Sequence, residues 1–167
     1  MNRTLTARTS SPEETIALGV LIGQLLVGRD VVSLVGGLGA GKTTFVKGVA
    51  EALGGQGAVR SPTFAFVHHH ACNPPIDELL HVDLYRLDRP QEVLGLALDE
   101  LVDNGTVLII EWMERAEGLL GAPSVVVDFS APSEQTRLIE LSMSAPRLAG
   151  LVDALEDGDR HSQRGSL

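Results

Sequence analysis

The amino-acid sequence predicts an α/β fold, in which helices alternate with strands. An apolar run at 30–36 leads into a glycine-rich loop, and a helical pattern follows that loop and stops at Gly54. A second continuous apolar run lies at 106–112. Such runs are typical of strands that are covered on both faces. The 167 residues, 44% of them hydrophobic, suit one domain with a sizeable core, and we expect it to span 11–155.

The first elements follow from local signals. Residues 1–10 are polar and predict a flexible N-terminus. A helix is expected to begin at Ser11, because a serine cap followed by Pro12 and then Glu14 matches a capping box. Its apolar residues recur at helical spacing, and Gly28 is expected to end it.

The middle of the chain predicts a strand pair and a helix. Alternating patterns at 63–68 and 79–85 are joined by a loop containing two prolines, so we expect an antiparallel pair. Residues 88–105 predict one capped helix with four apolar positions, which are Leu94, Ala97, Leu98 and Leu101. The stretches "SVVVDF" and "RLIELSM" predict a closing hairpin, and the polar segment 156–167 a disordered tail.

Composition restricts the location and the partners of the protein. The formal net charge is −9 and no basic stripe is visible, so any RNA contact is expected to pass through a partner. Cys72 is the only cysteine, which excludes an internal disulfide and fits a reducing cytoplasm. The chain starts without an apolar signal segment and contains no apolar run of about 20 residues. We therefore expect a cytoplasmic protein without a membrane partner.

The glycine loop predicts a nucleotide site. Residues 36–43 read "GGLGAGKT" and fit G-x-x-x-x-G-K-[ST] at every defined position. Glycines let successive N–H groups surround a phosphate, and the following helix adds its positive end. Lys42 is expected to bind the β- and γ-phosphates, and the Thr43 hydroxyl can ligate Mg²⁺. The predicted nucleotide-binding residues are Gly37, Leu38, Gly39, Ala40, Gly41, Lys42, Thr43 and Thr44.

Two acids are candidates for the chemistry. The chain has neither N/T-K-x-D nor D-x-x-G, which favours ATP over GTP. Glu111 follows the apolar "VLII" and can hold Mg²⁺, although an ordinary carboxylate at a strand end is the alternative. Asp83 lies among apolar residues in "LHVDLYRL", which indicates a functional neighbour such as a metal, a water or an arginine. The alternative is a solvated position on an edge strand.

Other residues leave their roles open. Ser61 and Thr63 predict a loop that responds to the γ-phosphate, or a plain turn into a strand. His68–His70 cannot all reach one metal ion, because successive strand residues point to opposite faces, and we expect a solvated strand end. Arginine side chains can neutralise charge in a transition state or can be exposed or ion-paired, and this applies to Arg60, Arg86 and Arg115.

Together these stretches resemble the TsaE (YjeE) family, small P-loop ATPases of bacterial tRNA threonylcarbamoyladenosine synthesis. The resemblance spans roughly 13–130 and rests on motifs in the family's order, namely "EETIALG", "GGLGAGKTTFVKGVAEALG", "VRSPTFAFV", "HVDLYRL", "EVLGLALDE" and "IIEWMERAEGLL". It implies a P-loop NTPase-like three-layer sandwich, whose mostly parallel central sheet has antiparallel extensions. It also implies ATP, Mg²⁺ and two partners, TsaB and TsaD, with tRNA reached only through that complex.

The resemblance also implies residue roles. Lys42 binds phosphates, while Thr43 and Glu111 hold Mg²⁺. Asp83 organises the metal or the attacking water, so Lys42, Asp83 and Glu111 form the expected catalytic set. Trp112 matches the family's active-site tryptophan, and the loop with Ser61 and Thr63 resembles a switch.

The leading hypothesis is an ATPase that drives or resets a TsaB–TsaD assembly. A small-molecule kinase is the first alternative, but such kinases usually carry an arginine-bearing lid, and no arginine cluster of that kind is visible. The second alternative is a binding module that ATP gates with negligible turnover.

Overall fold

A computed structural model describes most of the chain, namely residues 2–55, 59, 66–116, 118–144, 146–147 and 149–152. Within these residues a seven-stranded sheet has the order β1-β7-β6-β2-β5-β4-β3. In chain order the strands are β1 (Asn2–Thr9), β2 (Val31–Val35), β3 (Val67–Ala71), β4 (Glu78–Asp83), β5 (Thr106–Glu111), β6 (Val125–Ser130) and β7 (Arg137–Ser144).

The centre of the sheet is parallel and its edges are antiparallel. β2 pairs in parallel with β5 and β6, and β5 pairs in parallel with β4. β7 and β1 extend one side by antiparallel pairing, and β3 does the same on the other side. The predicted sheet, mostly parallel with antiparallel extensions, is therefore confirmed.

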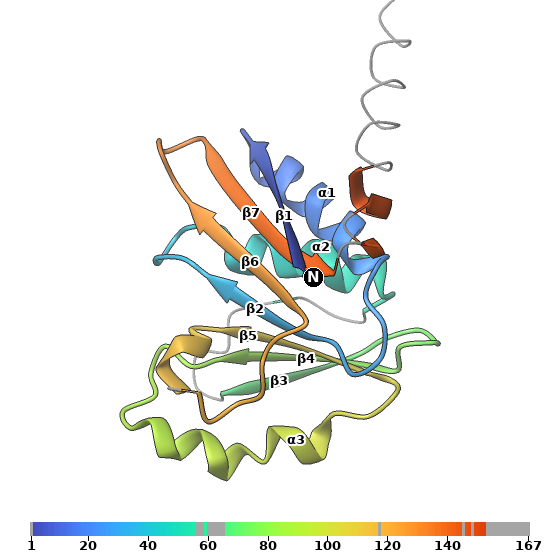
Figure 1. Cartoon of the computed structure of the whole chain (residues 1–167), viewed down its shortest axis with the longest axis vertical. Helices are drawn as coiled ribbons and strands as arrows, with labels where there is room; N and C mark the ends of the chain where they lie inside the picture. The colour runs from blue at the N-terminus through green and yellow to red at the C-terminus, as the bar shows by residue number, and fades with distance from the viewer. Residues whose placement is uncertain are drawn as a thin grey trace, which may run out of the picture.

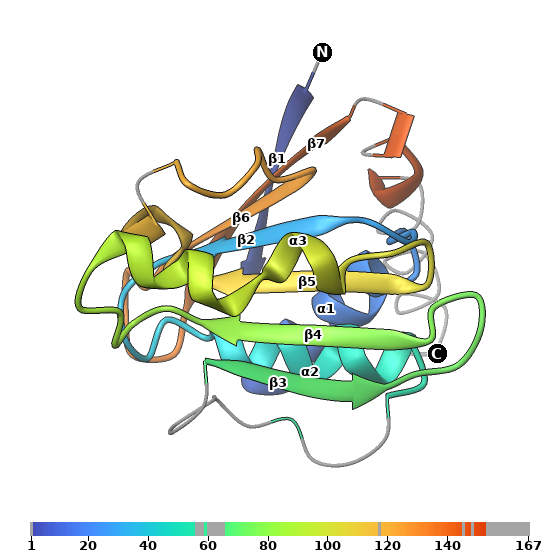
Figure 2. The ribbon, with the colours of Figure 1, turned by 90° about the horizontal axis from the view of Figure 1, so that it is seen from below.

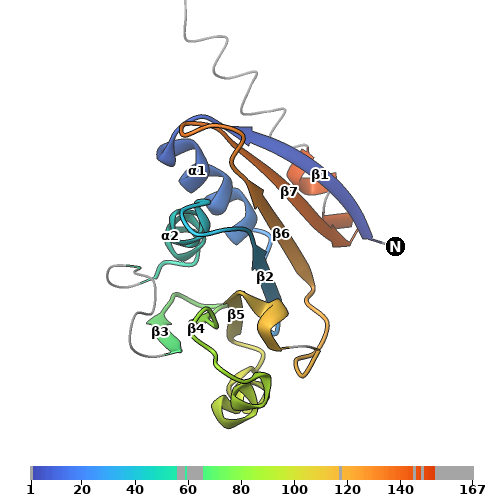
Figure 3. The same ribbon diagram turned by 90° about the vertical axis from the view of Figure 1, so that its left-hand side faces the viewer.

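Helices cover both faces of this sheet, so the fold has three layers. On one side lie α1 (Pro12–Gly23) and α2 (Lys42–Ala52), and the sheet curves around them (Figure 3). On the other side lie η1 (Pro90–Leu96), α3 (Leu98–Leu101) and η2 (Met113–Ala116) (Figures 1 and 2). Alternate strand residues fill two cores: Val32 and Leu34 pack toward α1 and α2, whereas Leu108 and Ile110 pack toward η1.

Two glycines let α1 and α2 pack closely. A Cβ atom added to Gly19 would overlap the carbonyl oxygen of Phe45, and one added to Gly48 would overlap that of Ile16. The backbones therefore approach to a distance that a side chain would prevent. This contact sets the position of α2, whose first turn follows the glycine loop.

The predicted serine cap of α1 is confirmed at Ser11, but Glu14 bonds back to the residue before the cap instead of to the cap itself. The Ser11 hydroxyl accepts a hydrogen bond from the Glu14 amide at 3.1 Å, and Glu14 Oε2 accepts one from the Ser10 amide at 2.6 Å. α1 ends at Gly23, which is earlier than the expected end at Gly28.

The predicted flexible N-terminus is wrong for residues 2–9. β1 pairs with β7 along its whole length, from Asn2 opposite Ser144 to Thr9 opposite Arg137. Leu5 and Ala7 pack against the core while Thr4, Thr6 and Arg8 are exposed, so this segment of polar composition has a period of two.

The single helix predicted at 88–105 is also wrong. The segment forms η1 and the four-residue α3, separated at Ala97, whose φ of 48° lies in the left-handed region. Because this residue changes the chain direction, the helical spacing does not carry across it. Leu98 is buried, but Leu94 is 60% exposed and Leu101 is exposed as well.

Other predicted elements are partly visible. The antiparallel pair around the two prolines is confirmed as β3 and β4, but residues 63–65 lie outside the described part of the chain. The closing hairpin is confirmed as β6 and β7. The predicted tail 156–167 also lies outside the described residues. None of the helices among the described residues has the length and apolarity that crossing a bilayer requires.

Candidate functional site

The glycine loop joins β2 to α2 at the carboxyl edge of the parallel strands. Gly36, Gly39 and Gly41 have φ angles of 138°, 74° and 106°, which side chains disfavour. A Cβ atom on Gly36 would also lie 2.7 Å from the Phe129 carbonyl oxygen. This backbone leads directly into the amino end of α2, where unpaired N–H groups favour an anion.

Lys42 lies across this loop. Its side chain is only 5% exposed, and Nζ donates to the carbonyl oxygens of Gly36 at 2.7 Å and Gly37 at 2.8 Å. Nζ also lies 4.7 Å from the ring centroid of Trp112. Burial lowers the pKa of Lys42 below its ordinary value, and the nearby carboxylates, Glu111 foremost, oppose that shift.

Glu111 ends β5 beside the start of α2. It is buried, and its Oε1 accepts a hydrogen bond from Thr43 Oγ1 at 3.3 Å and another from His81 Nε2 at 2.8 Å. The two predicted metal ligands, Thr43 and Glu111, are thus in contact although 68 residues separate them. Hydroxyl and carboxylate oxygens are ligands that suit Mg²⁺.

Asp83 lies at the same edge of the sheet. It ends β4, its register partner is Glu111, and its charge acts on Lys42. Asp83 Oδ1 accepts a hydrogen bond from the Tyr85 amide at 2.9 Å. Because β4 lies between β3 and β5, the edge-strand alternative for Asp83 is wrong.

Trp112 forms an aromatic wall beside Lys42. Its φ of 61° is in the left-handed region, a strained backbone that often occurs at functional sites. The ring lies 5.1 Å from that of Tyr85, and the Arg115 guanidinium lies 5.1 Å and 5.7 Å from the Tyr85 and Trp112 rings. Of the three predicted arginines, Arg115 therefore lies beside the site, whereas Arg60 is outside the described residues.

The structure tests some of the remaining predictions, because only part of the chain is described. Ser61 and Thr63 lie outside them, so the predicted switch remains a prediction. The three histidines of β3 do alternate, because His69 pairs with Glu78 at 2.7 Å while His70 is buried on the other face. The expected solvated strand end is therefore wrong for His70. In the described part of the chain, no cluster of three histidines, cysteines or acids can hold a metal.

Two residues near the loop have no predicted role. His81 is fully buried against Glu111, and its only sequence signal is that it shares a strand face with Asp83. Arg137 on β7 donates from Nη2 to the Gly39 carbonyl oxygen at 3.3 Å. That contact joins residues 98 positions apart, and no local pattern indicates it.

A pocket lies beside the glycine loop. Its volume is about 390 Å³, and Gly39, Gly41 and Thr44 form one wall. Ser11 and Arg137 also line it, so the start of α1 and the β6–β7 hairpin border the same open pocket. This volume suits a small-molecule ligand.

Comparisons with known proteins agree on one family. The family model described as "Threonylcarbamoyl adenosine biosynthesis protein TsaE" matches residues 9–139. The tRNA threonylcarbamoyladenosine biosynthesis protein TsaE of Bacillus subtilis is 36% identical over 155 residues, which cover 93% of this chain and 96% of that protein. Its counterpart in Rickettsia conorii is 35% identical, over 89% of this chain and 85% of the relative.

A solved structure has the same fold. The crystal structure of Bacillus subtilis YdiB superposes with a TM-score of 0.74 at 32% sequence identity. The match covers 95% of this chain and 98% of that one.

Proposed function

The chain belongs to the TsaE family, and from this premise we propose that it binds and hydrolyses ATP with Mg²⁺ in tRNA threonylcarbamoyladenosine biosynthesis. The observation that carries the proposal is the contact between Thr43 Oγ1 and Glu111 Oε1, 3.3 Å long, beside Lys42. It joins the hydroxyl of the nucleotide loop to an acid at the end of the neighbouring strand, the pair that P-loop NTPases use.

The residues present fit a magnesium ion that a nucleotide helps to hold. Mg²⁺ is usually bound by one or two protein oxygens together with substrate phosphates. Thr43 and Glu111 supply two oxygens, and no larger ligand cluster exists among the described residues. When bound, Mg²⁺ neutralises charge on the phosphate oxygens.

The chain's own side chains have separate tasks. Lys42 exchanges its contacts with the Gly36 and Gly37 carbonyls for the β- and γ-phosphates, and the amino end of α2 binds the same anion. Asp83 orients the attacking water from the end of β4. Trp112 shields one side of Lys42 from solvent, which strengthens electrostatic interactions there.

The nucleoside occupies the pocket beside the loop. Gly39 and Gly41 line this pocket of about 390 Å³, so a nucleotide whose phosphates lie on the loop can place its nucleoside there. Arg137 helps to shape this space by holding the Gly39 carbonyl.

The hydrolysis serves a partner assembly. We propose that TsaB-like and TsaD-like proteins form that assembly, and that ATP turnover drives or resets it. The net charge of −9 supports indirect contact with tRNA, because direct binding depends largely on neutralising phosphates.

Phosphate release tests this function. The full chain should hydrolyse ATP with Mg²⁺, and turnover should rise when purified TsaB-like and TsaD-like proteins are added. Lys42→Ala should lower turnover at least about 100-fold, the effect of removing one stabilising group from an active site. Lys47→Ala, at an exposed position of the same helix, is the matched control. Equal turnover in the wild type and Lys42→Ala would contradict the proposal.

A further inference from the structure

A buried histidine contacts the carboxylate at the end of β5. His81 lies on β4, its side chain is 0% exposed, and its Nε2 atom is 2.8 Å from Glu111 Oε1. In the register of β4 and β5, Asp83 lies beside Glu111 and His81 lies two residues further into the strand. The histidine therefore approaches the carboxylate from the interior of the sheet.

The surroundings of the ring select its tautomer. A carboxylate oxygen accepts hydrogen bonds, so Nε2 carries a hydrogen and donates it to Glu111. The other nitrogen, Nδ1, is buried and has no hydrogen-bond partner among the described residues. Because a buried N–H without a partner is costly, the tautomer with hydrogen on Nε2 alone fits best. Glu111 is thus the one polar partner of this ring in the described part of the chain.

Both contacts of the carboxylate involve the same oxygen. Thr43 Oγ1 and His81 Nε2 donate to Oε1 of Glu111, and the contact from His81 is the shorter one, at 2.8 Å against 3.3 Å. Among the described residues no hydrogen bond reaches Oε2. The carboxylate is therefore anchored through one oxygen while the other remains available to a ligand.

From this geometry we propose that His81 is a positioning residue, which fixes the orientation of Glu111 for the metal–nucleotide complex. The inference rests on the proposed function. Hydrogen bonds of this kind set the direction of a ligating side chain, and removing them commonly weakens metal binding 10- to 100-fold.

A second buried histidine provides a matched control. His70 on β3 is also buried, and its Nε2 atom likewise lacks a hydrogen-bond partner among the described residues. It lies on the same sheet face, since its ring is near that of His68 and the register partner of His68 is His81. His70 has no hydrogen bond to Glu111, so replacing it removes a buried imidazole without removing the anchor.

Trp112 allows binding to be measured apart from turnover. It is the only tryptophan and its ring lies 4.7 Å from Lys42 Nζ, so its fluorescence should report nucleotide binding. The full-length wild type, His81→Leu, His81→Gln and His70→Leu are titrated with ATP in EDTA, and then with Mg²⁺ at saturating ATP.

The proposal predicts a specific pattern. Affinity for ATP in EDTA should be the same in all four proteins, because Lys42 and the glycine loop are intact. The Mg²⁺ concentration for half-maximal response should rise about tenfold in His81→Leu. It should stay near the wild-type value in His81→Gln, whose amide can still donate to Glu111, and in His70→Leu.

Two results would overturn the inference. One is a Mg²⁺ shift in His81→Leu that is no larger than in His70→Leu. The other comes from ¹⁵N NMR of the wild-type protein, and needs no folded variant: a hydrogen on Nδ1 with none on Nε2 would exclude the donated bond. A wild type without Mg²⁺-dependent ATP binding would refute the proposed function and this inference together, whereas a normal wild type with indistinguishable histidine variants refutes this inference alone.

Discussion

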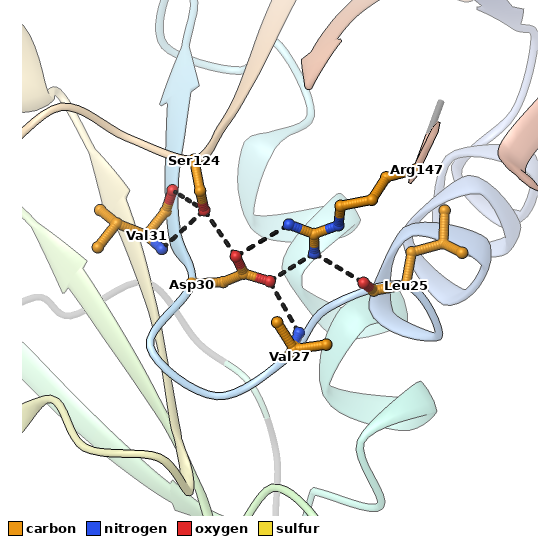
Figure 4. A network of polar contacts seen from close by, with 6 residues as sticks. All are labelled: Leu25, Val27, Asp30, Val31, Ser124 and Arg147. Atoms are coloured by element: carbon orange, nitrogen blue, oxygen red, sulfur yellow. Dashed lines mark hydrogen bonds and ion pairs between the residues drawn. The ribbon is translucent and has the colours of Figure 1, made fainter. Parts of the chain in front are cut away.

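A buried acidic side chain lies near each end of β2, and the surroundings of the two differ. At the amino end, Asp30 accepts hydrogen bonds on both oxygens (Figure 4). Ser124 Oγ and Arg147 Nη1 donate to Oδ1 at 2.8 and 3.0 Å, and the Val27 amide and Arg147 Nη2 donate to Oδ2. At the carboxyl end lies Glu111 of the neighbouring strand, and the described residues donate hydrogen bonds to only one of its oxygens.

This difference predicts that the Asp30 end supports the fold and that the Glu111 end binds a ligand. The Asp30 cluster joins the α1–β2 loop, Ser124 just before β6, and Arg147, and both carboxylate oxygens of Asp30 are occupied by donors from the protein. The other end combines glycines at positive φ, a strained Trp112 and a half-paired carboxylate. Strain and unused hydrogen-bonding capacity are typical of sites that a ligand completes.

The largest expected effect comes from a change at the Glu111 end of β2, which we call the ligand end. Glu111→Gln keeps the shape of the side chain and can still accept hydrogen bonds from His81 and Thr43, but it removes the charge that a metal needs. We expect ATP turnover to fall about 100- to 1000-fold. Thermal unfolding should remain within a few degrees of the wild type, so phosphate release and Tm together check the prediction. A large loss of Tm would show that this end also supports the fold.

The next largest effect is a loss of stability when the Asp30 cluster at the opposite end is changed. Asp30→Ala leaves the partly exposed Arg147 guanidinium without its carboxylate, and loss of hydrogen bonds to a charged group costs about 2 kcal/mol. Urea unfolding should show this loss, while turnover per folded molecule stays unchanged. Asp128→Ala, at an exposed position on β6, is the control and should change stability by less than about 0.5 kcal/mol. Unchanged stability in Asp30→Ala would contradict the structural role of the cluster.

The contribution of Asp30 to stability should also depend on pH. Burial alone would raise the pKa of Asp30, but hydrogen bonds from Arg147, Val27 and Ser124 outweigh it and hold that pKa below the ordinary 3.8. A depressed pKa contributes stability that is complete above the unfolded value and is lost as the pH falls toward the folded value. The stability difference between wild type and Asp30→Asn should therefore shrink when unfolding is measured at pH 3 rather than pH 7. A difference that grows in acid would contradict the sign of this shift.

The smallest effect concerns the backbone of the glycine loop. Gly37 and Gly39 both have open space where a Cβ atom would lie, but only Gly39 has a positive φ, of 74°. Gly39→Ala should therefore destabilise the protein by about 1 kcal/mol, and Gly37→Ala should cost less. Chemical denaturation of the two variants measures the difference, and equal costs would mean that the loop adjusts its backbone freely.

Local sequence patterns indicate the residues of the ligand end, but they do not indicate the Asp30 cluster. The glycine motif, Thr43 and Glu111 belong to short signals along the chain, and the ends of adjacent parallel strands bring such signals together. The helix cap at Ser11 was equally visible. By contrast, the bond between Arg147 and Asp30 spans 117 residues, and that between Arg137 and Gly39 spans 98.

The failures have physical causes too. The polar composition of β1 conceals the alternation at Leu5 and Ala7. Nothing in the sequence marks the left-handed turn at Ala97 that divides the segment 88–105. The role of His81 depends on Glu111 of the neighbouring strand, which no local pattern of β4 indicates.

The glycine contact between α1 and α2 has a consequence for genetics. Gly19 and Gly48 touch neither Lys42 nor Glu111, yet a methyl group at either position would collide with the backbone of the facing helix. To relieve that collision α1 and α2 must separate, and any part of that movement taken by α2 displaces the turn that follows the glycine loop. A screen for temperature-sensitive alleles should therefore recover substitutions at these two glycines, with defects that resemble those of the nucleotide site.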